Sequence, residues 1–559
     1  HYPQINHPEI ILDQALYTDL EPKYSLTYGI TNTILRSYIN KLLPLSMNIP
    51  EWLPVEILQK YNLPSFYNAL QELHQGGDKL RLSKSILRLK FDEAFSSQMG
   101  LKILRNKNQK LKNRTFAKNL PLQERVMLKF GYNLTEGQKD ALKDIEQDQL
   151  SQTQMIRMLQ GDVGCGKTIV GLLAACNVIA AKSQVVFMAP TEVLAIQHFK
   201  FICKMLETEE TEVRLITSKT TTKERNILFA EIASGKVDCV IGTHAVLNEE
   251  LIFKDLRFIV IDEQHKFGVL QRIAISEKGN NPDILLMSAT PIPRSLSMIY
   301  FGDLAMSKIS QVPNNRKKIL TFVTSISKMP DIIKAISNRI SINQKIYWIC
   351  PLIEAKESEE SDNKNDYEII DVQKRYEYLH DIFGEKVTYL HGGIKQEKKN
   401  EIIENFRSGI CPVLISTTVV EVGIDVPDAT LIIIENAERF GLAQLHQLRG
   451  RVGRSDLESI CILLKGSCIS SVARTRLSIM KESLDGFFIA EKDLALRGEG
   501  EFFGEKQSGE QNFRFLDLAE DAYILEEISK VMNKIKIDSP AELAVSLFSK
   551  LTPDQNIIL

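Results

Sequence analysis

The 559 residues exceed what one hydrophobic core ordinarily holds, and a prior of roughly 100–200 residues per domain favours three to five domains. Hydrophobic residues make up 44% and charged residues 25%, which is ordinary for globular proteins and excludes a disordered or fibrous chain. The formal net charge of −2 gives no global attraction for nucleic acid, so DNA binding would require local basic surfaces.

Eight cysteines form neither CxxC pairs nor a zinc-spaced cluster with histidine, which favours free thiols in a reducing compartment and no structural metal. No apolar run approaches the length of a membrane span, and no secretory leader opens the chain. We therefore expect a cytosolic protein that does not engage a membrane.

Residues 1–77 carry prolines between short apolar stretches, and this pattern predicts short helices joined by turns, including Glu56–Lys60 and Ser65–His74. From Asp78 to Lys129, fourteen Lys and Arg residues stand against four Asp and Glu residues. Apolar residues recur there at roughly helical spacing, at Leu82, Ile86, Leu89 and Phe95. The stretch predicts a basic amphipathic helix, which is either a solvated face or a DNA-contacting one; the motifs below favour DNA contact.

After Gly131 the sequence changes to short β-branched runs separated by segments long enough for helices. One series comprises Val185–Met188, Val237–Ile241, Phe258–Ile261 and Ile284–Met287. A second comprises Ile346–Cys350, Val387–Leu390, Val413–Ser416 and Leu431–Ile434. This alternation predicts an α/β protein with two tandem parallel-sheet lobes. Val312–Lys318 is the expected linker, and the polar Glu354–Asp366 is an expected solvated loop.

Eight consecutive residues fit the phosphate-loop pattern GxxxxGK[ST]: Gly161, Asp162, Val163, Gly164, Cys165, Gly166, Lys167 and Thr168. Apolar residues precede them and a helix-compatible run, Ile169–Ala175, follows, so a chance glycine-rich turn is the weaker interpretation. In such loops the backbone N–H groups hold phosphates, while Lys167 would neutralise the outer phosphates and Thr168 would ligate Mg²⁺. ATP and Mg²⁺ are the expected cofactors.

The apolar run Phe258–Ile261 ends in two acids, Asp262 and Glu263. Acids often simply end strands, but a phosphate loop upstream in the same lobe favours a catalytic pair. Asp262 would then hold Mg²⁺ beside Thr168, and Glu263 would polarise the attacking water.

Hydrolysis also needs positive charge on the phosphoryl group as the transition state forms. The segment Gln447–Arg454 has the pattern QxxGRxGR, in which Arg451 and Arg454 are candidate arginine fingers. Surface salt bridges are the alternative, which this spacing makes less attractive. The predicted catalytic residues are Lys167, Glu263, Arg451 and Arg454.

With these motifs placed, both lobes resemble superfamily 2 helicases. Other segments agree with this resemblance: Ala189–Glu192, Gly242–His244, Asp262–His265, Ser288–Thr290 and Leu390–Gly392. It implies that Ser288 and Thr290 couple hydrolysis to lobe movement. It also places four threonines along the nucleic-acid strand, namely Thr191, Thr243, Thr417 and Thr418. The segment from Tyr132 to Gln138 resembles an adenine-recognising motif, so both of these residues are expected to bind the nucleotide.

Longer segments are similar to the bacterial RecG family of ATP-dependent DNA helicases: Asp262–Arg272, Ser288–Leu296, Ser416–Thr430 and Glu435–Ser455. Ile489–Gly509 resembles the coupling motif that this family shares with the transcription-repair coupling factor, and Arg497 and Gln507 match its coupling positions. The resemblance runs from about residue 50 to the end. Departures at Cys165, Lys266 and Glu499 remove no phosphate, metal or finger group.

The resemblance implies two RecA-like lobes with ATP in the cleft between them, preceded by a helical linker and followed by a helical coupling segment. The expected domains are residues 1–115, 116–313, 314–466 and 467–559. The implied activity is ATP-driven remodelling of branched DNA, by regression of stalled forks and migration of Holliday junctions. The family's fork-splitting wedge is expected upstream of His1, with only its last residues, Tyr2–Pro8, in this chain.

As partners we expect branched DNA and, as a further candidate, single-stranded-DNA-binding protein, with a monomeric chain in the bacterial cytosol near the nucleoid. Two alternatives stay open. One is a duplex translocase like the transcription-repair coupling factor, which would carry further modules before the motor. The other is a catalytically silent, ATP-gated DNA scaffold, against which the presence of Glu263, Arg451 and Arg454 argues.

Overall fold

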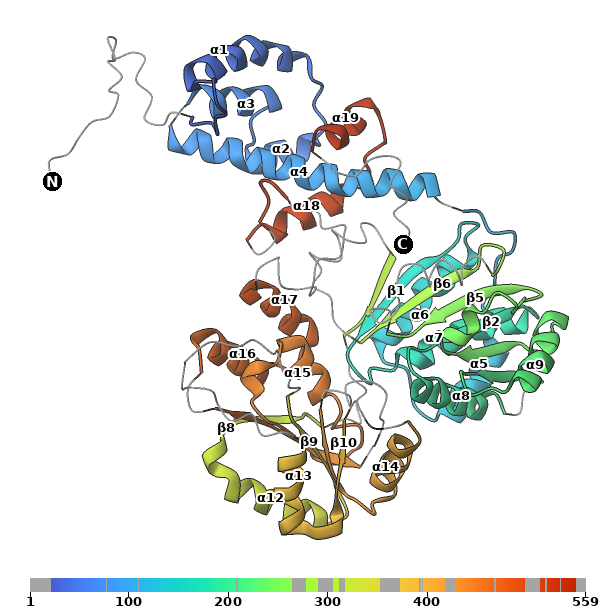
Figure 1. Ribbon diagram of the computed structural model, residues 1–559. Coiled ribbons are helices and arrows are strands. Elements are labelled where there is room, and N and C mark those ends of the chain that lie inside the picture. The colour runs from blue at the N-terminus through green and yellow to red at the C-terminus, as the bar shows by residue number, and fades with distance from the viewer. Residues whose placement is uncertain are drawn as a thin grey trace. The chain divides into compact units, whose positions relative to one another are not determined.

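The computed structural model describes residues 22–76, 78–108, 110–207, 210–263, 278–289, 305–310, 317–351, 372–391, 394, 396–417, 426, 428–466, 469–497, 513–517, 520–532 and 534–548. The chain divides into two compact units (Figure 1). The first comprises His1–Asn108, Arg294–Asp303 and Gly498–Ile557, and the second comprises Gln109–Pro293, Leu304–Arg497 and Ile558–Leu559.

The first unit is helical where the structure describes it. Its elements are α1 (Asn32–Leu42), the 3-10 helix η2 (Leu43–Asn48), α2 (Val55–Tyr61), α3 (Phe66–Gln75), α4 (Lys79–Asn108), α18 (Ala522–Met532) and α19 (Ser539–Phe548). The 30-residue α4 is the central element, because α3, α18 and α19 all pack against it. Phe91, Phe95 and Met99 recur every four residues along α4 and are fully buried. The C-terminal helices thus belong to the same core as the N-terminal ones.

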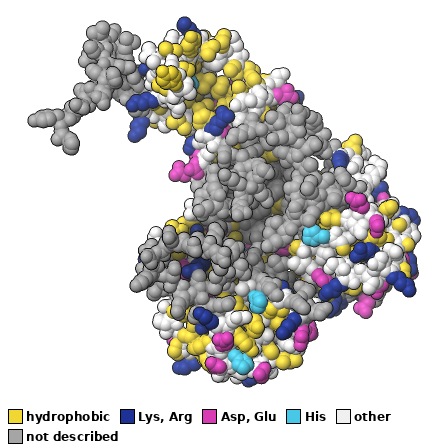
Figure 2. Space-filling model, in the orientation of Figure 1, with side chains coloured by type: hydrophobic (Ala, Val, Ile, Leu, Met, Phe, Trp, Pro, Cys, Tyr) yellow, Lys and Arg dark blue, Asp and Glu magenta, His cyan; other side chains and the backbone are white. Residues whose placement is uncertain are grey.

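The basic stretch of α4 differs from the solvated or DNA-contacting helix that its composition predicts. Arg88 is fully buried and donates to both Glu51 and Asp92. Several described basic residues between Asp78 and Lys129 have acidic or carbonyl partners within the protein, among them Arg81, Arg88, Lys90, Lys102, Lys112, Arg114 and Lys118. The expectation was wrong for Arg88 and Lys112, whose side chains are buried in ion pairs. A count of charges cannot distinguish a buried ion pair from a solvated cation. On the face that Figure 2 displays, basic and acidic side chains of the described residues are interspersed.

Arg88 provides a test of this interpretation of α4. Replacing it by methionine should lower the free energy of local unfolding of α4 by ~3–5 kcal/mol, because Asp92 would remain buried without its cation. Arg81→Met, on the exposed start of the same helix, should cost ~0–1 kcal/mol. Amide hydrogen exchange along α4 measures both quantities, and equal protection in the two variants would contradict the structural role of Arg88.

The second unit contains the two parallel sheets that the sequence predicts, which confirms the expected fold class. In the described residues of the first lobe, the strand order is β3-β4-β2-β5-β6-β1-β7, and every recorded pairing is parallel. The strands are β1 (Ile156–Gly161), β2 (Gln184–Met188), β3 (Val213–Ile216), β4 (Cys239–Gly242), β5 (Leu256–Ile261), β6 (Asp283–Ser288) and β7 (Ala305–Ile309). The helices are α5 (Leu120–Phe130), α6 (Glu136–Leu150), α7 (Lys167–Ala180), α8 (Glu192–Leu206) and α9 (Thr222–Ser234), with the 3-10 helix η3 (His244–Leu247).

The second lobe repeats this architecture with the strand order β10-β11-β9-β12-β13-β8 among its described residues. Its strands are β8 (Leu320–Ser325), β9 (Lys345–Ile349), β10 (Val387–Leu390), β11 (Val413–Ser416), β12 (Ala429–Ile434) and β13 (Ile460–Lys465). Its helices are α12 (Met329–Ser341), α13 (Val372–Phe383), α14 (Gln396–Ser408), α15 (Leu442–Arg449), α16 (Ser471–Glu482) and α17 (Gly486–Arg497), with the 3-10 helices η5 (Ile326–Lys328), η6 (Gly384–Lys386) and η8 (Ala437–Arg439). Both α15 and α16 pack against α17.

Two of the predicted segments fall largely or wholly outside the described residues. The linker Val312–Lys318 is described only at its last two residues, and the loop Glu354–Asp366 is not described at all. Within the parts of the chain that the structure does describe, no helix combines the length and the hydrophobicity that crossing a membrane requires.

Candidate nucleotide and helicase site

The phosphate loop joins β1 to α7, the strand-loop-helix context that its sequence predicts. Gly164 and Gly166 have φ angles of 75° and 85°, in the left-handed region that favours glycine. A Cβ on Gly166 would lie 2.3 Å from Gln138 Nε2, and one on Gly161 would lie 2.4 Å from Cys165 Sγ. The loop is therefore a tight turn that only small residues fit, and it ends at the N-terminus of α7, where anions bind favourably.

Lys167 is the first residue of α7 and lies inside this loop. Its side chain is buried, and Nζ donates to Gly161 O at 2.6 Å and to Asp162 O at 3.2 Å. An ammonium group held among backbone carbonyls by the loop suits charge-assisted contact with a phosphate.

Gln138 is fixed against the loop by both ends of its amide. Its Oε1 accepts from Thr135 N at 2.8 Å within a capping box that begins α6, and its Nε2 donates to Cys165 O at 2.8 Å. Tyr132 is exposed, and its ring meets that of Phe130 edge-on with centroids 5.6 Å apart. The structure thus brings Gln138 to the loop and leaves Tyr132 at the surface.

Asp262 directly follows β5, and its carboxylate is held by two hydrogen bonds. Oδ2 lies 2.9 Å from His198 Nε2, and Oδ1 accepts from Glu263 N at 3.0 Å. Burial alone would raise the pKa of Asp262, but the hydrogen bond from His198 and the nearby charges of His198 and Lys167 lower it below its ordinary value. A lowered pKa favours the ionised form of Asp262, which is the form that a magnesium ligand needs.

His198 was missed by reasoning from the sequence. It lies on α8, which follows the Ala189–Glu192 motif, and its side chain is buried. A single histidine on a helix carries no pattern that separates a core residue from one that positions a carboxylate. Its role becomes visible only when β5 and α8 are placed together in space.

Glu263 has an unusual backbone and an unusual acidity. Its φ angle is 50°, in the left-handed region. Burial and the charge of Asp262 raise its pKa, against the opposing effects of Lys167, a backbone hydrogen bond from Ala289 and the charge of Arg451. A carboxyl with a raised pKa is suited to accept a proton from water.

The finger candidates, Arg451 and Arg454, follow α15 in the second lobe. Arg451 is buried, and its charge acts on Glu263, which belongs to the first lobe. Arg454 Nε donates to Gly450 O at 3.2 Å, one turn earlier in the chain. The charge of Arg451 therefore acts on Glu263, although the two residues lie far apart in sequence.

The predicted coupling and nucleic-acid residues lie at or just after the carboxyl ends of parallel strands, where the structure describes them. Ser288 ends β6 and pairs in register with Gln160 of β1. Thr417 directly follows β11, and Thr243 directly follows β4. Thr191 lies just beyond the end of β2. Thr191 caps α8, and the hydroxyl of the buried Thr417 has no hydrogen-bond partner among the residues that the structure describes. Thr290, Thr418 and Gln507 lie outside the described residues, and Arg497 is the last residue of α17.

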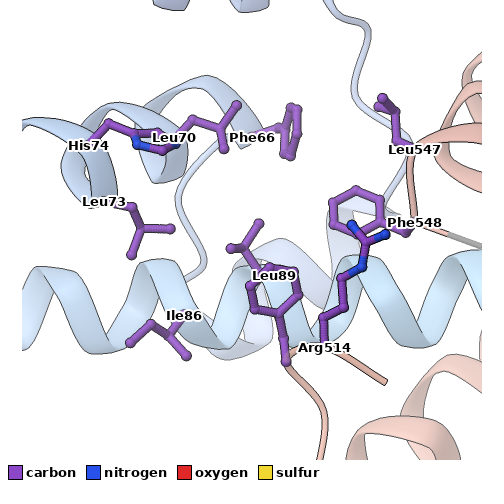
Figure 3. A pocket seen from close by; sticks show the side chains of 10 residues that line it. Phe66, Leu70, Leu73, His74, Ile86, Leu89, Arg514, Leu547 and Phe548 are labelled. Carbon is purple, nitrogen blue, oxygen red and sulfur yellow. The ribbon is translucent and has the colours of Figure 1, made fainter. Parts of the chain in front are cut away.

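The residues present fit ATP and Mg²⁺. The turn formed by Gly161–Gly166 is a cradle that added Cβ atoms would fill, and it opens onto a helix N-terminus. The hydroxyl of Thr168 and the carboxylate of Asp262 are oxygen donors, the ligands that Mg²⁺ prefers. A separate cavity of about 400 Å³ lies in the first unit (Figure 3). Its lining is mainly apolar, including Phe66, Leu89 and Phe548, with His74 and Arg514 as its polar side chains, and it is not next to the phosphate loop in sequence or fold unit.

Comparison with known proteins agrees with this geometry. The DEAD/DEAH box helicase model matches residues 135–299, and the helicase conserved C-terminal domain model matches residues 327–456. The ATP-dependent DNA helicase RecG of Bacillus subtilis is 38% identical over 514 residues, which cover 91% of this chain and 74% of that protein. The Thermotoga maritima RecG is 37% identical over 539 residues, covering 96% of this chain and 68% of that protein.

A solved structure of RecG bound to a three-way DNA junction is 34% identical and has a TM-score of 0.66. The match covers 91% of this chain and 66% of that one, so the chain spans about two thirds of that protein's length. With the identity, the coverage and the two helicase models taken together, the chain belongs to the RecG family of ATP-dependent DNA helicases.

Proposed function

We propose that this chain is the motor of a DNA translocase that hydrolyses ATP between its two lobes and remodels branched DNA. One observation carries the proposal: the phosphate loop holds the Lys167 ammonium at Gly161 O and Asp162 O, and the acid pair after β5 presents an Asp262 carboxylate held by His198. Arg451 of the second lobe is buried, and its charge opposes the raised pKa of Glu263 in the first lobe. The general base, the phosphate-binding lysine and the finger are thus gathered from both lobes. Hydrolysis in this arrangement depends on the lobes' relative position, which is what a motor requires.

In the proposed mechanism the backbone of Gly161–Gly166 and the Lys167 ammonium bind the phosphates. Thr168 and Asp262 would hold Mg²⁺, which would supply charge neutralisation to the phosphoryl group. The Glu263 carboxylate orients the attacking water and accepts its proton. Arg451 and Arg454 place positive charge on the phosphoryl group as negative charge develops. Tyr132 and Gln138 would contact the base.

Ser288 and Thr290 would transmit hydrolysis to the DNA-contacting threonines, because Ser288 ends the strand beside the one that leads into the phosphate loop. Thr191, Thr243, Thr417 and Thr418 would contact the strand backbone through hydroxyl and N–H donors. Arg497 and Gln507 would pass lobe movement to the DNA branch. The junction as substrate is supported by the relative solved in complex with a three-way DNA junction.

Two substitutions separate nucleotide binding from hydrolysis. Lys167→Ala should abolish ATP binding or turnover, because it removes the cation of the phosphate loop. Glu263→Gln should keep nucleotide affinity and lower turnover by roughly 100-fold or more, because an amide cannot accept the water's proton. Phosphate release and equilibrium binding of a fluorescent nucleotide measure the two effects. The exposed Lys236→Ala and Glu212→Gln serve as matched controls. Parental turnover in Glu263→Gln would overturn the general-base role.

The substrate class is tested by measuring ATP hydrolysis and strand displacement side by side on a fork, a Holliday junction, a linear duplex and duplex RNA. We expect DNA to stimulate hydrolysis, with weaker binding as salt rises, because phosphate contacts release counterions. Faster hydrolysis on the fork and the junction than on linear duplex or RNA would support branched DNA as the substrate. Hydrolysis stimulated equally by linear duplex, without strand displacement, would favour a translocase like the transcription-repair coupling factor. DNA binding without hydrolysis would favour the silent scaffold.

A further inference from the structure

The phosphate loop of the first lobe is hydrogen-bonded to the second lobe through a side chain that the mechanism above leaves unused. The carboxylate of Asp162 lies 3.1 Å from Nε2 of His446, on α15. The backbone of Gly486, at the start of α17, also hydrogen-bonds to Asp162. Burial alone would raise the pKa of Asp162, but the hydrogen bonds from His446 and Gly486 and the charge of Lys167 lower it, which favours a carboxylate that accepts from His446.

The imidazole of His446 is held in one orientation from its other side. Its Nδ1 lies 2.9 Å from Arg449 Nη2, and a guanidinium can only donate. Nδ1 is therefore the acceptor, and Nε2 carries the proton that it donates to Asp162. Arg449 in turn donates from Nη1 to the carbonyls of Met480 and Ser483, both at 2.8 Å. Because His446 and Arg449 are both buried, this chain of hydrogen bonds is shielded from water.

A close backbone approach accompanies the hydrogen bond. Gly450 lies one helical turn after His446, and a Cβ built on it would lie 3.0 Å from Val163 Cβ. Val163 is the residue after Asp162 in the phosphate loop. Asp162 thus meets His446, and its neighbour Val163 meets Gly450. His446 and Gly450 are four residues apart and so lie on one face of the helix.

We propose that Asp162 and His446 are positioning residues, which dock the finger segment on the phosphate loop and so set where Arg451 lies relative to Glu263. The inference rests on the proposed function and deepens it. Arg451 directly follows Gly450, so a displacement of the docked segment displaces the finger with it. The contact between Asp162 and His446 joins the phosphate loop directly to the second lobe. Bound phosphates would provide a second connection, through Arg451 and Arg454.

A double-mutant cycle tests the link. Asp162→Ala, His446→Ala and the double variant should each lower kcat of DNA-stimulated hydrolysis about tenfold, as expected for a hydrogen bond to a charged group. The affinity for a fluorescent ADP should change much less, since the phosphate-binding backbone and Lys167 remain. The double variant should be no worse than either single one, because both remove the same contact.

Conservative variants separate docking from general stability. Asp162→Asn keeps an oxygen acceptor for His446 and should retain most of the parental kcat. Gly450→Ala removes no polar group but crowds Val163, and it should lower kcat like the loss of the hydrogen bond. Glu458→Ala, an exposed ion-pair residue of the second lobe, is the matched control and should leave kcat unchanged.

Additive losses in the double variant, equal losses of kcat and of ADP affinity, or a parental kcat in all variants would each overturn the docking role. So would losses that merely follow a drop in melting temperature, measured on the same samples. A parent that hydrolyses no ATP would instead overturn the proposed function, and the inference with it. Parental activity combined with unaffected variants would overturn the inference alone.

Discussion

In a parallel sheet all strands end at the same edge, and this constraint determines where the chemistry of this protein lies. The phosphate loop follows β1, the acid pair follows β5, and Ser288 ends β6. These strands are neighbours in register, since Gln160 pairs with Ser288 and Phe258 pairs with Asp283. Residues more than 100 positions apart in the chain therefore meet at one edge, as in other open α/β proteins that bind ligands there. The same rule places Thr417 at the equivalent edge of the second sheet.

This regularity explains why much of the architecture was predictable. Buried parallel strands appear in the sequence as continuous β-branched runs, and the eight runs singled out there correspond closely to β2, β4, β5, β6, β9, β10, β11 and β12. Strands such as β7 and β8 were not predicted. They are edge strands of their sheets and carry mixed sequences, AMSKI and LTFVTS, with partly exposed residues. A half-exposed edge strand lacks the apolar run that marks a central one.

Contacts between side chains that are distant in sequence could not be predicted from the sequence. Arg88 looks like a surface cation in a basic stretch, yet it satisfies two carboxylates inside a helical core to which the C-terminal helices contribute. Similarly, His198 and His446 are single histidines on helices without a spacing pattern. Their roles follow from carboxylates that are distant in sequence: His198 contacts Asp262, and His446 contacts Asp162. Periodicity predicts elements, whereas such pairs depend on how the elements pack.

The central claim is that catalysis needs charge delivered from the second lobe to the acid pair of the first. Arg451→Ala and Arg454→Ala test it most directly, through kcat of DNA-stimulated ATP hydrolysis and the dissociation constant of the nucleotide, measured on the same protein. The account predicts that kcat falls by roughly 1000-fold or more, as for other arginine fingers, while the dissociation constant changes far less. Equal changes in both quantities, or an unchanged kcat, would contradict it.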